Sequence, residues 1–208
     1  IWRFLKEPDH NVTRRPAKAL KMRYLDRRYR EILAIGVVVY LSMAVSTQIM
    51  GFYLPHVLSL DAEASAAPLA MTQGISACCM VFVQLVLIQR LQWPPMHYLI
   101  TGVPMIFVGF IFYTIATELW MLQVAAGFVG FGLGLTGPGY SAEVSLRVEP
   151  EEQGAVAGLI SACPALGFVI GPLSAGVLYD MRPELPYLLT AVMLLLLFPV
   201  LLWVNRKP

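Results

Sequence analysis

The chain has 208 residues, of which 58% are hydrophobic and only 13% are charged, against about 25% charged residues in an ordinary soluble domain. Its hydrophobic residues come in long unbroken runs and its mean hydropathy is positive, which excludes a soluble domain and predicts an all-α integral membrane protein. The net charge of +2 is unevenly distributed, and no nucleic-acid-binding motif accompanies the basic residues.

The first 31 residues are strongly basic. They carry ten of the fifteen lysine and arginine residues, which predicts that residues 1–31 form a cytoplasmic loop beside a membrane span. Residues 1–5 read as the end of an earlier helix, and the chain begins at Ile1 without a methionine. We therefore expect the chain to be a fragment of a longer protein.

The first span is expected at about residues 32–55 and contains no charged side chain. One face of it carries a stripe of small and polar residues, namely Tyr40, Ala44, Thr47, Gln48 and Gly51. Polar groups on a spanning helix face away from lipid, toward a solute cavity or toward another helix, and the spacing leaves both possibilities open. Gln48 is the first candidate for a solute contact, because its amide both donates and accepts hydrogen bonds. Tyr40 and Thr47 are further cavity candidates.

Five more spans follow the first. They are expected at about residues 67–88, 98–116, 119–142, 154–179 and 187–204, with a cytoplasmic tail at 205–208. In the fourth span, Gly127, Gly130, Gly134 and Gly137 share a face, which predicts either close helix packing or room for a solute. Gln123 in the same span is another cavity candidate.

The distribution of charge supports six spans. With the basic N-terminal segment in the cytoplasm, the inner segments carry fourteen of the fifteen basic residues, and the outer loops carry only Arg182. This asymmetry is the one that membrane proteins show between cytoplasmic and outer loops. We therefore expect both ends of the chain in the cytoplasm.

Residues that perform catalysis or hold a metal are not grouped in this sequence. The three histidines lie far apart, the three cysteines lie inside apolar runs, and no nucleophile elbow or phosphate-binding loop occurs. We therefore predict no enzyme, no catalytic residue, no metal and no cofactor. No charged residue or histidine falls at the middle of a span, so either the protein is not proton-coupled or its coupling group lies outside this part of the protein.

The fifth span carries the most specific pattern in the chain. Its members are Gly158, Gly167, Gly171, Pro172 and Gly176. This spacing resembles the antiporter glycine motif of the major facilitator superfamily, with Ala175 in place of the first glycine of the usual Gly-Gly ending. The preceding run, residues 141–154, resembles the cytoplasmic loop before the penultimate helix in the drug:proton antiporter branches.

The resemblance implies one half of a twelve-helix major facilitator fold. The loop at residues 89–97 lacks the Gly/Asp/Arg-rich signature of an N-terminal half, and the long basic lead-in resembles the central loop between halves. We therefore interpret the chain as the C-terminal six-helix half. In this fold the first and fourth helices of each half line the cavity, and the second and fifth shape the interface between halves.

The implied function is alternating-access transport of a small organic or drug-like solute, by proton-coupled export across a bacterial inner membrane. The implied partners are the solute, protons, the lipid bilayer and the missing N-terminal half. The alternative is a self-contained six-span channel or scaffold that dimerises through its glycine-rich helix faces.

Overall fold

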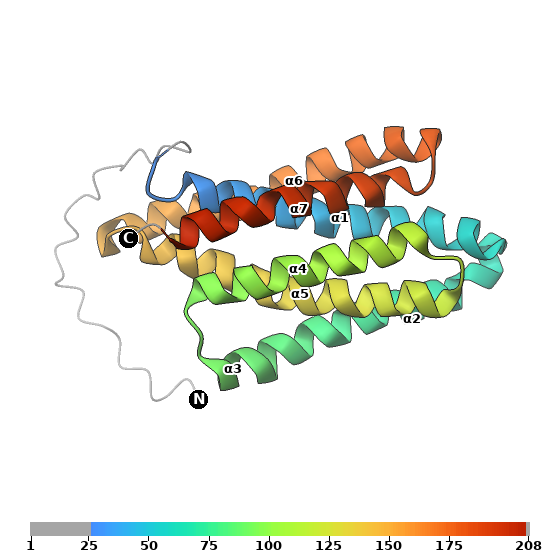
Figure 1. Ribbon diagram of the computed structural model, residues 1–208, viewed down its shortest axis with the longest axis horizontal. Coiled ribbons are helices and arrows are strands. Elements are labelled where there is room, and N and C mark those ends of the chain that lie inside the picture. The colour runs from blue at the N-terminus through green and yellow to red at the C-terminus, as the bar shows by residue number, and fades with distance from the viewer. Residues whose placement is uncertain (1–25, 207–208) are drawn as a thin grey trace, which may run out of the picture.

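The computed structural model describes residues 26–206, which form long helices running back and forth along one axis (Figure 1). The main helices are α1 (Arg30–Leu58), α2 (Ala62–Phe82), α4 (Pro95–Ile115), α5 (Leu119–Leu146), α6 (Gln153–Met181) and α7 (Leu185–Asn205). A π-helical segment, Val83–Leu87, continues α2 into the short α3 (Ile88–Leu91), and a 3-10 turn, Pro150–Glu152, precedes α6. Residues 1–25 of the predicted basic loop and residues 207–208 of the predicted tail lie outside the described residues.

Six helical stretches are long and apolar enough to cross a membrane. Between residues 26 and 206 the chain has no strand. The prediction of an all-α fold with six membrane-spanning helices is therefore confirmed. The second helical stretch is longer than the predicted span, because the Asp61 carboxylate accepts a hydrogen bond from the Ala64 amide (2.7 Å) and starts α2 at Ala62.

The two ends of the bundle differ in charge. At one end lie the turns α1–α2, α4–α5 and α6–α7 (Figure 1, right). We call this the acidic end, because its charged residues within 26–206 are Asp61, Glu63, Glu118, Asp180, Arg182 and Glu184. The opposite end holds the start of α1 and the α3–α4 and α5–α6 connections. We call it the basic end because six of the seven arginines within 26–206 lie there, although six carboxylates accompany them.

Glycines let α5 pack closely against two neighbours. A Cβ on Gly132 would lie 2.7 Å from the Gly102 carbonyl oxygen of α4, and a Cβ on Gly102 would lie 2.8 Å from the Gly132 carbonyl oxygen. On the other side, a Cβ on Gly130 would collide with the Ser76 carbonyl of α2. These glycines therefore serve helix packing, because any larger residue would push the backbones apart.

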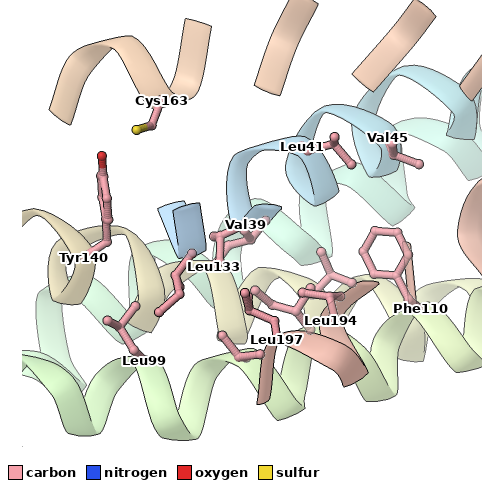
Figure 2. Packing of buried hydrophobic residues seen from close by; sticks show 14 of the residues in the cluster. Val39, Leu41, Val45, Leu99, Phe110, Leu133, Tyr140, Cys163, Leu194 and Leu197 are labelled. Carbon is pink, nitrogen blue, oxygen red and sulfur yellow. The ribbon is translucent and has the colours of Figure 1, made fainter. Parts of the chain in front are cut away.

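The core of the bundle is built from side chains of α1, α4, α5 and α7. Figure 2 shows Val39, Phe110, Leu133 and Leu194 converging from these four helices, all of them buried. Tyr140 of α5 and Cys163 of α6 extend the core toward the basic end. The Tyr140 hydroxyl donates to the Ile160 carbonyl (3.3 Å), which ties α5 to α6.

An aromatic cluster forms the part of the core that is nearest the acidic end. The ring of Tyr187 lies 4.7 Å from that of Tyr53 and 4.9 Å from that of Tyr113, measured between centroids. The Tyr53 hydroxyl donates to the Tyr113 carbonyl (2.8 Å) and so joins α1 to α4. Together these contacts hold α1, α4 and α7 as one unit.

Candidate functional site

One strip of α1 is exposed although the rest of the helix is deeply buried. Thr47, Gln48, Gly51 and Phe52 are exposed, and Phe52 retains 69% of its accessible surface. The neighbouring Ile49 and Met50 are buried in the core. The strip is therefore a defined face of α1 whose side chains stay exposed in the described bundle, and it contains two of the predicted cavity residues.

The predicted stripe on α1 divides into two environments. Ala44 packs against α6, where a Cβ on Gly171 would lie 2.9 Å from the Ala44 Cβ. Tyr40 is half-buried, with its ring edge-on to Tyr140 at a centroid distance of 6.0 Å. The part of the stripe nearer the start of α1, Tyr40 and Ala44, therefore packs against other helices. Only the part from Thr47 to Gly51 is open.

The glycines of α6 also lie in two environments, some against α1 and some facing open space. A Cβ on Gly167 would lie 2.7 Å from the Leu41 amide nitrogen, so Gly167, like Gly171, lets α6 pack directly on α1. Gly158 and Gly176 face away from this contact, and a Cβ on either would meet nothing within 4 Å. Helical geometry explains why Gly158 and Gly176 behave alike. They are eighteen residues apart, which is five full turns, so they lie on the same face of α6.

A cavity of about 380 Å³ lies between the open part of α1 and the end of α6. It is lined by Gln48, Ile49, Phe52, Pro172, Gly176, Tyr179 and Asp180. We call it the α1–α6 cavity. Its volume falls within the range of small-molecule sites, roughly 300–1,000 Å³.

Contacts around the α1–α6 cavity fix its walls. The Tyr179 hydroxyl donates to the Phe52 carbonyl (3.0 Å), and the rings of Tyr179 and Phe52 lie 6.3 Å apart at a tilt of 55°. On the other flank of the strip, the Gln73 side-chain amide of α2 donates to the Thr47 carbonyl at 3.4 Å. Three helices therefore meet at the exposed strip of α1.

The structure brings only part of the predicted site together. Gln48 lies in the α1–α6 cavity with Pro172 and Gly176, whereas Tyr40, Thr47 and Gln123 do not line it. The sequence reasoning missed Phe52 and Asp180, which lie one helical turn after Gln48 and Gly176 respectively. That four-residue spacing is the signal that could have identified them.

No cluster of three or more His, Cys, Asp or Glu side chains suited to a metal ion is found between residues 26 and 206. The cavity offers an amide, a carboxylate and two aromatic rings.

Comparison with known proteins identifies the family. A family model described as the Major Facilitator Superfamily matches residues 98–208, which include most of α4 and all of α5, α6 and α7. The search of curated proteins found no match.

Proposed function

This chain belongs to the major facilitator superfamily, whose members are membrane transporters, and from that premise we propose that it forms one half of a secondary transporter for a small organic solute. The proposed mechanism is alternating access, in which two six-helix halves rock around a site near the membrane midplane. The half described here would be the C-terminal one.

The observation that carries this proposal is the exposed polar strip on α1. An amide such as that of Gln48 is costly against acyl chains, so a polar strip on a spanning helix belongs beside water, a solute or another protein segment. A second bundle placed over α1 would cover the strip and enclose the α1–α6 cavity. The walls of the solute pathway would then include Thr47 and Gln48.

We further propose that transport is proton-coupled export. The support is the resemblance of the α6 glycines to an antiporter motif. Within residues 26–206, the acidic, basic and histidine side chains lie near helix ends and none lies in the middle of a helix. The group that exchanges the proton would therefore belong to the other half.

The test uses the full-length protein in proteoliposomes with an imposed pH gradient and a panel of organic compounds. We expect gradient-dependent flux of at least one compound, reduced about fivefold by Gln48→Leu through the loss of one hydrogen bond. Gln84→Leu is the matched control, because Gln84 is also exposed but lies on the π-helical part of the second helix, outside the α1–α6 cavity. Absence of gradient-dependent flux across the panel would count against the proposal.

A second candidate function is a six-span channel or scaffold that self-associates. It is favoured by Gly154 and Gly158, four residues apart on α6, since a Cβ on either would meet nothing within 4 Å. Two such faces can pair closely across a dimer. Chemical cross-linking in native membranes separates the candidates: the scaffold predicts Gly158→Cys disulfides between two copies, whereas the transporter predicts disulfides within one chain to a cysteine introduced in the other half.

A further inference from the structure

We propose that the α1–α6 cavity binds an organic cation, such as a quaternary ammonium compound. The inference rests on the proposed transport function and names the chemical class of the solute. Four features of the cavity and its surroundings carry it.

The first feature is a carboxylate without a basic partner. Asp180 lines the cavity and is exposed. The ion pairs found among residues 26–206 involve Arg28, Arg30 and Arg147, all at the basic end, and none reaches Asp180. A bound cation would supply the counter-charge that the described part of the chain does not.

The second feature is the aromatic wall. Phe52 and Tyr179 present two rings at a tilt of 55°, and the hydroxyl of Tyr179 is engaged by the Phe52 carbonyl. The hydrogen bond holds the Tyr179 ring in place beside the cavity that both residues line. Aromatic faces attract ammonium groups within about 6 Å of the ring centroid.

The third feature is the absence of basic side chains from the lining. No lysine, arginine or histidine lines the cavity. A positively charged ligand therefore meets no like charge there, whereas an anion would face the Asp180 carboxylate.

The fourth feature is the charge around the cavity mouth. The acidic end carries five carboxylates, those of Asp61, Glu63, Glu118, Asp180 and Glu184, against a single arginine, Arg182, within the described residues. A surface of one predominant sign raises the local concentration of ligands of opposite sign. Cations would therefore be concentrated near the cavity before they bind.

The test compares two soluble probes of the same shape, choline and its uncharged analogue 3,3-dimethylbutan-1-ol. Binding to the full-length protein in lipid nanodiscs is measured by isothermal titration calorimetry, with empty nanodiscs subtracted. We expect choline to bind at least about tenfold more tightly than the alcohol, since one charge–charge contact in a partly hydrated site has that effect. Asp180→Asn should weaken choline binding about tenfold, and Phe52→Leu about threefold.

Glu63→Gln is the matched control, because Glu63 is exposed and its replacement removes one carboxylate from the same end of the bundle without changing the cavity lining. It should change choline binding by less than about twofold, because exposed charges outside the site are screened by salt. Equal losses in Asp180→Asn and Glu63→Gln would overturn the inference, as would equal affinity for the two probes or no choline binding to the wild-type protein.

Flux and binding measurements together distinguish a missing cation site from a missing transport activity. Gradient-dependent flux of an uncharged solute without choline binding would overturn the cation site and leave the transporter. Choline binding lost in Asp180→Asn, without flux of any compound, would leave the site and overturn the transporter.

Discussion

At the scale of single residues, the glycines of α6 show that one sequence pattern can serve two surfaces. Gly167 and Gly171 face α1, where the two backbones are in contact, whereas Gly158 and Gly176 face open space. A methyl group has opposite consequences in the two places. At a backbone contact it forces the helices apart, and on an open face it only raises helix propensity.

We expect Gly167→Ala to destabilise the protein by about 1–3 kcal/mol, because the added Cβ would lie 2.7 Å from backbone atoms that cannot rotate away. Gly158→Ala, on the same helix, should leave thermal stability unchanged or slightly raised. The measurement is thermal unfolding of purified protein followed by size-exclusion chromatography. A stability loss of similar size in both variants would show that α6 does not pack on α1 as described.

At the scale of elements, an ionic contact joins the segment before α1 to the start of α6. The Arg28 guanidinium donates to both carboxylate oxygens of Glu152, at 2.8 Å and 3.0 Å, and also pairs with Asp26. Glu152 in addition accepts a hydrogen bond from the Glu149 amide as part of a capping box. The same carboxylate therefore caps a helix and anchors a segment that lies more than 120 residues earlier.

This contact predicts a pH dependence of stability. Hydrogen bonds from Arg28 lower the pKa of Asp26 below its ordinary value of 3.8. The contribution of Asp26 to stability is therefore fully present above pH 3.8 and is lost as the pH falls through the lowered pKa of the folded protein. Near neutral pH no change from this group is expected.

Arg28→Ala tests the contact, and Arg27→Ala is the matched control, since no ion pair is found for Arg27 among the described residues. We expect Arg28→Ala to cost up to about 1 kcal/mol at neutral pH and low salt, and less at high salt, because the pairs are partly exposed. Below pH 4 the difference between the variants should shrink. An Arg27→Ala effect as large as that of Arg28→Ala would mean that general charge, not the paired contact, stabilises this end.

At the scale of the whole molecule, burial is distributed very unevenly among the helices. In the most apolar 18-residue segment of each helical stretch, 61% of the residues are buried in α1, 11% in the second stretch and 28% in the α6 stretch. The second stretch also exposes small residues at helical spacing, such as Ala70, Gly74 and Cys78. Both poorly covered helices thus offer small-residue faces, which suit contact with other membrane helices.

The orientation of the bundle gives a prediction at the same scale. If the basic end faces the cytoplasm, a cysteine at Glu184 should react with a membrane-impermeant maleimide in intact cells. A cysteine at Glu149 should react only after the cells are permeabilised. Cys78, Cys79 and Cys163 are first replaced by alanine to remove background labelling. Labelling of position 149, but not of 184, in intact cells would reverse the orientation.

The sequence by itself determined the class of the protein and the number of its spanning helices. Runs of apolar residues of membrane length are local features, and the bilayer demands that each run form a helix, so no tertiary information was needed. The uneven distribution of arginine and lysine is equally local. The glycine spacing of α6 was also readable in the sequence, and the match to the major facilitator superfamily over residues 98–208 agrees with it.

Only the tertiary structure decided which residues meet. Gln48 and Gly176 lie more than 120 residues apart and share one cavity, whereas Tyr40 and Ala44, on the same predicted stripe as Gln48, pack against α5 and α6. Periodicity places residues on a common face of one helix, but it does not give the rotation of that helix against its neighbours. That rotation depends on glycine contacts such as Gly167 against Leu41, which is why Phe52 and Asp180 entered the candidate site only once the helices were assembled.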